Sequence, residues 1–143
     1  MNRRKIGYAL FGVYGLVMLW LLFGQRWGQN AGALNWQIFD TIRRYFWVLR
    51  NSTDPELRRH AWVNLAGNVV MFVPLGFFGP WLFPRLRKFG IHILAMLAVI
   101  VAVELLQWLT GLGTCDVDDL LLNLPGTCLG FLLWKWPARR WLE

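Results

Sequence analysis

Residues 91–110 read IHILAMLAVIVAVELLQWLT, and this stretch decides the class of fold. A helix of about 20 apolar residues is long enough to cross the hydrocarbon core of a bilayer, which is roughly 30 Å thick. Glu104 is the only Asp, Glu, Lys or Arg residue in the stretch. The sequence therefore predicts a membrane-spanning helix that carries one carboxylate inside it.

Three more apolar stretches have a similar length, and they cover residues 6–24, 61–83 and 117–136. The first follows three basic residues and so resembles a secretory signal, but its apolar run is longer than usual and no A-x-A cleavage site follows it. We predict that it stays as an anchor. The last opens with two aspartates and contains Pro125, so neighbouring helices must cover its interrupted backbone.

The composition indicates an integral membrane protein. Hydrophobic residues make up 57% of the 143 residues, charged residues make up 16%, and the mean hydropathy is +0.40. We predict a single domain over residues 1–143, with an all-α fold: a polytopic bundle of about four transmembrane helices. The net charge of +7 does not indicate a nucleic-acid site, because the basic residues stand at the ends of apolar stretches, where they anchor helices at lipid headgroups.

The distribution of Lys and Arg predicts the orientation, because cytoplasmic loops carry an excess of these residues. With the N-terminus inside, nine lie on the cytoplasmic side: Arg3, Arg4, Lys5, Arg85, Arg87, Lys88, Lys135, Arg139 and Arg140. Six lie on the outer side, all in the first loop: Arg26, Arg43, Arg44, Arg50, Arg58 and Arg59. We expect both termini in the cytoplasm, although the basic first loop opposes this orientation.

Apolar residues recur in that first loop at steps of three and four residues, namely Trp36, Phe39, Ile42, Phe46 and Leu49. Polar residues fall mostly between them, which predicts an amphipathic helix lying in the membrane interface. Two roles stay open for it. It could seal the top of the bundle, or it could act as a lid or as a surface that meets lipid headgroups.

Three of the apolar stretches each carry a pair of polar residues at helical spacing: Asn64 and Asn68, Glu104 and Gln107, and Asp119 and Asn123. Such residues cost several kcal/mol in hydrocarbon unless they are paired or face water, so they mark the interior of a bundle and a candidate functional site. Successive helices run in opposite directions, so the pairs form two layers on one side of the bundle. The deeper layer lies about 9 to 11 Å below the ends of the stretches.

The polar pairs have two interpretations. Amides and acids also join membrane helices by hydrogen bonds, and for the four amides this structural role is as good an explanation as binding. A carboxylate is a poor choice if only helix association is needed, so Glu104 and Asp119 favour function. We therefore predict that all six residues contribute to a binding site, with Glu104 as the candidate for any catalysis.

Three ordered motifs carry a resemblance to a known family. NVVMFVPLGF covers residues 68–77, ELLQ covers residues 104–107, and DVDDLLLNLPG covers residues 116–126. Together they resemble the VanZ-like family of bacterial membrane proteins over about residues 61–134. Pro125 departs from the family pattern, in which a residue other than proline is more common.

This resemblance implies a multi-pass protein of the bacterial cytoplasmic membrane with a role in the cell envelope. The member that gives the family its name is associated with low-level resistance to the glycopeptide teicoplanin, through a step that is not established. Antibiotic resistance is therefore one expectation for this chain. The resemblance leaves the oligomeric state open.

Three functions fit these observations. The one that needs the fewest assumptions is a non-catalytic protein whose intramembrane pocket binds a membrane lipid or a lipid-linked cell-wall precursor. The alternative is an enzyme with Glu104 as acid or base and a divalent cation on Asp116, Asp118 and Asp119. Acidic residues at the start of a helix are also favoured by the helix dipole alone, without any cation. An ion-coupled carrier is least favoured, because the sequence shows no internal repeat.

Four residues are expected to shape the helices. Pro74 lies inside a predicted helix and should kink or break it, with Gly76 close behind. Gly126 and Gly130 form a small-xxx-small pair that allows another helix to approach closely. We expect that close packing within one copy of the chain.

Overall fold

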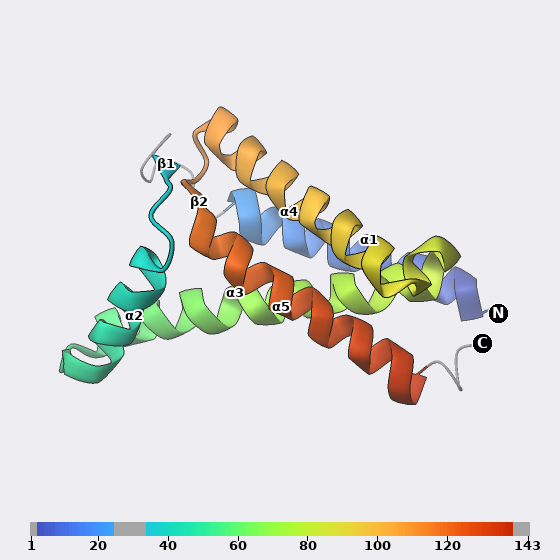
Figure 1. The fold of residues 1–143 in the computed structure, drawn as a ribbon, viewed down its shortest axis with the longest axis horizontal. Coiled ribbons are helices and arrows are strands. Elements are labelled where there is room, and N and C mark those ends of the chain that lie inside the picture. The colour runs from blue at the N-terminus through green and yellow to red at the C-terminus, as the bar shows by residue number, and fades with distance from the viewer. Residues whose placement is uncertain (1–2, 25–33, 139–143) are drawn as a thin grey trace.

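The computed structural model describes residues 3–24 and 34–138 (Figure 1). Its elements are α1 (Arg3–Leu19), the π-helical turn η1 (Trp20–Gly24), β1 (Leu34–Asn35), α2 (Asp40–Asn51), α3 (Pro55–Leu82), the 3-10 turn η2 (Pro84–Arg87), α4 (Phe89–Thr110), β2 (Cys115–Asp116), α5 (Val117–Leu133) and the π-helical turn η3 (Trp134–Ala138). Arg26, Arg139 and Arg140, which count in the predicted orientation, lie outside the described residues.

Four helices are long and apolar enough to cross a membrane, so the predicted all-α class and the four spans are confirmed. They cover Arg3–Gly24, Pro55–Leu82, Phe89–Thr110 and Val117–Trp136. The largest difference is at the start of α3, which begins before the apolar stretch does. Pro55 occupies its first turn and the Asp54 side chain accepts a hydrogen bond from the Glu56 amide at 2.9 Å, so local capping sets this end.

The helices continue through their prolines. α3 contains Pro74 and Pro80, α5 contains Pro125, and neither helix ends there. The sequence allowed either a kink or a break at Pro74, and the break does not occur. The interruption expected at Pro125 does not occur either. Each proline removes one backbone hydrogen bond, and the neighbouring turns hold the helix together around it.

Glycines allow α5 to cross α3 in direct backbone contact (Figure 1). A Cβ atom at Gly76 would lie 2.0 Å from the carbonyl oxygen of Thr127, and one at Gly130 would lie 2.0 Å from that of Val73. A Cβ atom at Gly126 would lie 2.1 Å from another α3 carbonyl oxygen. Any larger residue at these positions would push the two helices apart.

Two apolar clusters form the buried core. One contains Met18, Leu22, Phe72 and Ile100, and the other contains Trp81, Leu82, Phe131 and Trp134. Phe72 and Trp81 are nine residues apart on α3, so the clusters lie about 13 Å apart along that helix. Many large apolar side chains outside these clusters are exposed, as expected for helices that face lipid.

The first loop contains the predicted amphipathic helix, but the helix is shorter than its apolar pattern suggested. α2 begins at Asp40, so Trp36 and Phe39 precede it. Phe39 has a left-handed backbone, with φ of 65° and ψ of 9°, which ends the periodicity before the helix starts. α2 lies at one end of the bundle, beside the first turns of α3 (Figure 1).

A short pairing joins two distant loops. β1 pairs with β2 in parallel, with Leu34 opposite Cys115 and Asn35 opposite Asp116. The pattern of apolar residues gives no sign of this contact. It brings the segment before α2 against the start of α5.

Candidate functional site

The polar residues of three helices gather at the end of the bundle where α4 ends and α5 begins. Asn68 of α3 donates a hydrogen bond from Nδ2 to Oδ1 of Asp119 on α5, at 2.6 Å. Asn68 is buried and Asp119 is half-buried. This bond joins two of the predicted site residues across the α3–α5 crossing. A hydrogen bond to an ionised carboxylate is stronger than one between neutral groups.

Glu104 lies on α4 at the same end and is only 5% exposed. Its Oε2 atom accepts a hydrogen bond of 3.3 Å from the backbone amide of Asp116. A carboxylate oxygen can accept more than one hydrogen bond. Glu104 therefore holds the start of α5 against α4.

Gln107, one turn further along α4, joins α4 to the first helix. Its Nε2 atom donates to the carbonyl oxygen of Leu22 at 3.0 Å, and its side chain is buried. Leu22 lies in the π-helical turn η1, at the end of a helix, where backbone carbonyl oxygens lack partners within the helix. The structure thus gives Gln107 a role in packing.

Asn64 and Asn123 differ in their surroundings. Asn64 is half-buried and donates to the backbone carbonyl oxygen of His60 at 2.8 Å, so its amide group is used within its own helix. Asn123 is 2% exposed, and its Oδ1 atom has no hydrogen-bond partner among the described residues. Asn123 lies one turn beyond Asp119 on α5, so a buried acceptor lies close to the site.

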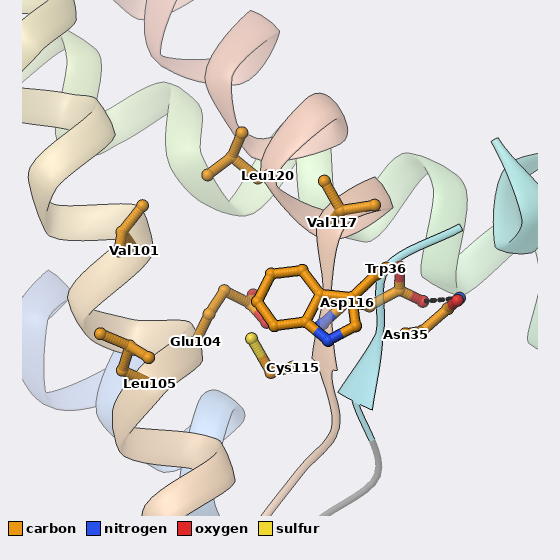
Figure 2. A pocket seen from close by; sticks show the side chains of 9 residues that line it. All are labelled: Asn35, Trp36, Val101, Glu104, Leu105, Cys115, Asp116, Val117 and Leu120. Carbon is orange, nitrogen blue, oxygen red and sulfur yellow. Dashed lines mark hydrogen bonds between the residues drawn. The ribbon is translucent and has the colours of Figure 1, made fainter. Parts of the chain in front are cut away.

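Asp116 caps α5 and holds the segment before α2. Its Oδ1 atom accepts from the backbone amide of Asp118 at 2.9 Å, which is the usual bond of an N-cap aspartate. Its Oδ2 atom accepts from the Thr41 hydroxyl at 2.6 Å and from Nδ2 of Asn35 at 3.2 Å. Figure 2 shows the bond between Asn35 and Asp116.

Asp118 is fully buried and binds the backbone at the start of α2. Its Oδ1 atom accepts from the amide of Phe39 at 2.6 Å, and its Oδ2 atom accepts from the amide of Ile42 at 3.0 Å. Helix N-termini have free amides and a positive dipole end, so a carboxylate is favoured there. Asp118 supplies from another segment the cap that α2 lacks in its own sequence.

These contacts do not support the cation site considered for Asp116, Asp118 and Asp119. Among residues 3–24 and 34–138, no group of three or more His, Cys, Asp and Glu side chains is arranged to hold a metal ion. Asp116 and Asp118 bind backbone amides instead, and Asp119 accepts from Asn68. Their spacing in the sequence reflects the capping of two helices.

One part of the site was not predicted from the sequence: residues 34–42, which we call the strap. The strap supplies Asn35, Trp36 and Thr41 to the region around Asp116 and Asp118. Its polar residues were visible in the sequence, but nothing there showed which distant residues they would meet. The apolar spacing instead assigned Trp36 and Phe39 to a helix.

A cavity of about 140 Å³ lies between the strap, α4 and the start of α5 (Figure 2). Val101, Glu104 and Leu105 form its α4 wall, while Trp36 and Cys115 come from the strap and β2. Nearly all of the wall surface is apolar. The side chains of Val101 and Leu105 are partly exposed on the outer surface of the bundle, so the cavity adjoins a lipid-facing side of α4.

The electrostatic character of this region is negative. Burial raises the pKa of the Cys115 thiol, and the charges of Glu104, Asp116 and Asp119 raise it further. The thiol therefore stays protonated at neutral pH. Of the described residues that line the cavity, none is a Lys, Arg or His. The cavity thus lies in a negatively charged region, with its carboxylates set behind a mostly apolar wall.

A family model described as VanZ/LLP1 matches residues 8–138, from α1 to η3, which is more of the chain than the motifs alone covered. No curated protein and no solved structure matches the chain. The match covers nearly the whole length and agrees with the four apolar helices. The chain is therefore a membrane protein of the VanZ/LLP1 family.

Proposed function

We propose that the cavity beside Glu104 binds the polar group of a membrane amphiphile, such as an envelope lipid or a lipid-linked glycan. The observation that carries this proposal is a buried carboxylate in the wall of an otherwise apolar cavity beside a lipid-facing helix surface. Ligand sites generally combine apolar walls with a few polar groups that fix the orientation of the ligand. An intramembrane carboxylate is also costly, which favours a functional role for it.

The size of the cavity limits what enters it. A cavity of about 150 Å³ accommodates a molecule as large as benzene, so 140 Å³ admits one ring-sized group and not a whole lipid. The rest of the amphiphile then lies along α4 outside the cavity. The partly exposed side chains of Val101 and Leu105 offer it an apolar surface.

The chemistry of the walls favours a ligand that donates hydrogen bonds. Asn68 donates to Asp119 and Gln107 donates to Leu22, so one N–H of each amide group already has a partner within the bundle. Glu104 is an acceptor, and negative charge repels phosphate. The hydroxyl groups of a glycan and an ammonium group both suit such a site.

The enzyme alternative has less support from the geometry. It needs Glu104 as acid or base together with a cation on the nearby aspartates. Asp116 and Asp118 bind the backbone of two helices, so they do not form such a site with Asp119. Binding without reaction accounts for the same cavity with fewer requirements.

The proposal is tested with amphiphiles that share one alkyl chain and differ in the head group. Purified protein in phosphatidylcholine nanodiscs is titrated with dodecyl glucoside, dodecylamine and dodecyl phosphate, and bound amphiphile is measured by native mass spectrometry. We expect dodecyl glucoside, dodecylamine or both to bind, and dodecyl phosphate not to bind. Binding of dodecyl glucoside alone indicates a glycan ligand, and binding of dodecylamine alone indicates an ammonium ligand.

The variant Glu104→Gln keeps the size of the side chain and removes its charge. We expect it to lower affinity at least tenfold, because hydrogen bonds to charged groups contribute about 1.5 to 3 kcal/mol. Glu56→Gln makes the same chemical change at an exposed position and should bind as the native chain does. Equal binding of all three amphiphiles, unchanged in Glu104→Gln, would contradict the proposal.

The family resemblance extends this proposal to the cell envelope of bacteria. We place the protein in the cytoplasmic membrane with both termini inside, on the balance of Lys and Arg between its two sides. Reporter fusions at each terminus test that orientation. Teicoplanin susceptibility of bacteria that express the native chain or Glu104→Gln, at matched membrane levels, tests a link to glycopeptides. Protection that the variant loses supports the link.

A further inference from the structure

The strap is fixed at both of its ends by α5 and the residues just before it. At the first end, β1 pairs with β2, and Asn35 donates to the Asp116 carboxylate. At the second end, the amides of Phe39 and Ile42 donate to the Asp118 carboxylate. The residues between these two anchors therefore have little freedom to move.

Phe39 has a backbone conformation that needs such support. It is the only residue other than glycine with a positive φ in the described parts of the chain. The left-handed region is unfavourable for a bulky side chain and persists only where surrounding contacts enforce it. The 2.6 Å bond from its amide to Asp118 is such a contact.

Trp36 lies between the two anchors and forms a wall of the cavity. Its neighbour Asn35 is bound to Asp116, and Phe39 three residues later is bound to Asp118. Figure 2 draws Trp36 and Glu104 among the residues that line the cavity. The Trp36 side chain is 72% exposed, so few protein contacts hold the ring itself in place. Its position depends on the strap.

An aromatic ring and a carboxylate that line the same cavity are suited to particular ligands. The faces of indole rings attract ammonium groups, with about 0.5 to 2 kcal/mol per contact. Aromatic rings also provide large apolar contact areas, and a carboxylate accepts hydrogen bonds from hydroxyl or ammonium groups. A sugar ring or an ammonium group that fills this cavity would meet residues of both kinds in its walls.

We propose that Trp36 is the aromatic contact for the ligand head group that Glu104 binds, and that Asp118 is a positioning residue that acts through the strap to hold Trp36 there. This inference rests on the proposed function of the cavity. Asp118 does not touch the ligand. It fixes the start of α2, and through Phe39 it fixes the side of the cavity opposite α4.

The test measures the affinity of the full chain for dodecyl glucoside and dodecylamine in nanodiscs. We expect Trp36→Ala to lower affinity about tenfold and Trp36→Phe to retain most of it, because the aromatic face remains. Asp118→Asn should also lower affinity about tenfold. The double variant should lose about tenfold and not a hundredfold, because both changes remove the same contact.

A disulfide distinguishes positioning from a general loss of structure. Leu34 and Cys115 are partners in the β1–β2 pairing, and neighbouring strands lie about 4.8 Å apart, which is within the Cα range of disulfides. In Leu34→Cys with Asp118→Asn, oxidation should restore affinity and reduction should remove it again. Leu34→Cys with Asp118 intact is the matched control, and its affinity should not depend on oxidation.

Two results would overturn the inference while the proposed function stands. In the first, native protein binds and Glu104→Gln does not, but Trp36→Ala binds as the native chain does. In the second, the losses from Trp36→Ala and Asp118→Asn add to about a hundredfold. If the native chain binds none of the three amphiphiles, the proposed function itself fails.

Discussion

The two ends of the bundle are built in different ways. At the polar end, around Glu104 and Asp118, side chains are joined to other segments by hydrogen bonds, and a cavity is left between them. At the aromatic end, around His92, Phe131 and Trp134, rings pack on one another, with centroids 4.8 Å apart for His92 and Phe131 and 5.6 Å apart for Phe131 and Trp134.

The treatment of polar atoms shows the difference most clearly. His92 is fully buried, and among the described residues its ring nitrogens form no hydrogen bond of standard geometry, the Thr127 backbone giving only a weak polar contact. The indole N–H groups of Trp81 and Trp134 are also buried and have no hydrogen-bond partner among the described residues. Apolar packing can hold a bundle end together even when a few buried polar atoms lack hydrogen bonds. Precise placement of a few side chains requires the directional bonds of the polar end.

The largest effect is expected at the crossing that joins the two ends. Gly130→Val places side-chain atoms against the α3 backbone, where even a Cβ atom lies 2.0 Å from a carbonyl oxygen. We expect a loss of about 3 kcal/mol or more in the free energy of unfolding, since α3 and α5 must separate. Thermal unfolding in nanodiscs measures it. Gly67→Val is the control, because a Cβ atom there meets nothing within 4 Å. Equal loss in both variants would refute the steric explanation.

A smaller effect compares the two ends directly. Gln107→Leu leaves the buried carbonyl oxygen of Leu22 without its partner and should destabilise the chain by about 1 to 3 kcal/mol. His92→Phe keeps a ring against Phe131 and removes two buried nitrogens that lack a hydrogen bond of standard geometry, so it should be neutral or stabilise by about 1 kcal/mol. Unfolding midpoints of the two variants measure this contrast. Similar destabilisation by both would show that His92 is satisfied in the membrane and that the ends do not differ in this respect.

The smallest effect concerns reactivity at the polar end. Burial and the charges of Glu104, Asp116 and Asp119 raise the pKa of the Cys115 thiol, so less thiolate forms at a given pH. In a Cys128→Ser background, alkylation at pH 8 should be several-fold slower than in the unfolded chain. Glu104→Gln should accelerate it slightly, because one charge is lost while burial remains. A rate equal to that of the unfolded chain would contradict the raised pKa.

The sequence predicted the spans because each is long and apolar, and it placed Glu104 inside the bundle because a carboxylate is unusual in such a stretch. It also indicated that Asp119 and Asn68 would lie at the same end, since helical spacing and alternating directions determine depth. These are properties of single helices and their order. The structure adds the partners, such as the bond between Asn68 and Asp119.

The strap could not be predicted in this way. Its contacts join residues 34–42 to Asp116 and Asp118, and no periodic pattern encodes a contact across that distance. Asp116, Asp118 and Asp119 were considered as a candidate cation site because the sequence shows three acidic side chains close together and does not show their hydrogen-bond partners. Their actual partners, which include the amides of Phe39 and Ile42, are backbone groups that every sequence contains.

The anchoring of the strap has a consequence for how the protein is made. Phe39 and Asp118 are 79 residues apart, and ribosomes add roughly 5 to 20 residues per second, so the strap waits on the order of 4 to 16 s for its partner to be synthesised. During that interval the start of α2 has no cap and no fixed place. The polar end therefore forms last, when α5 arrives, and a nascent chain that stops before Asp118 lacks the cavity wall however well its earlier helices insert.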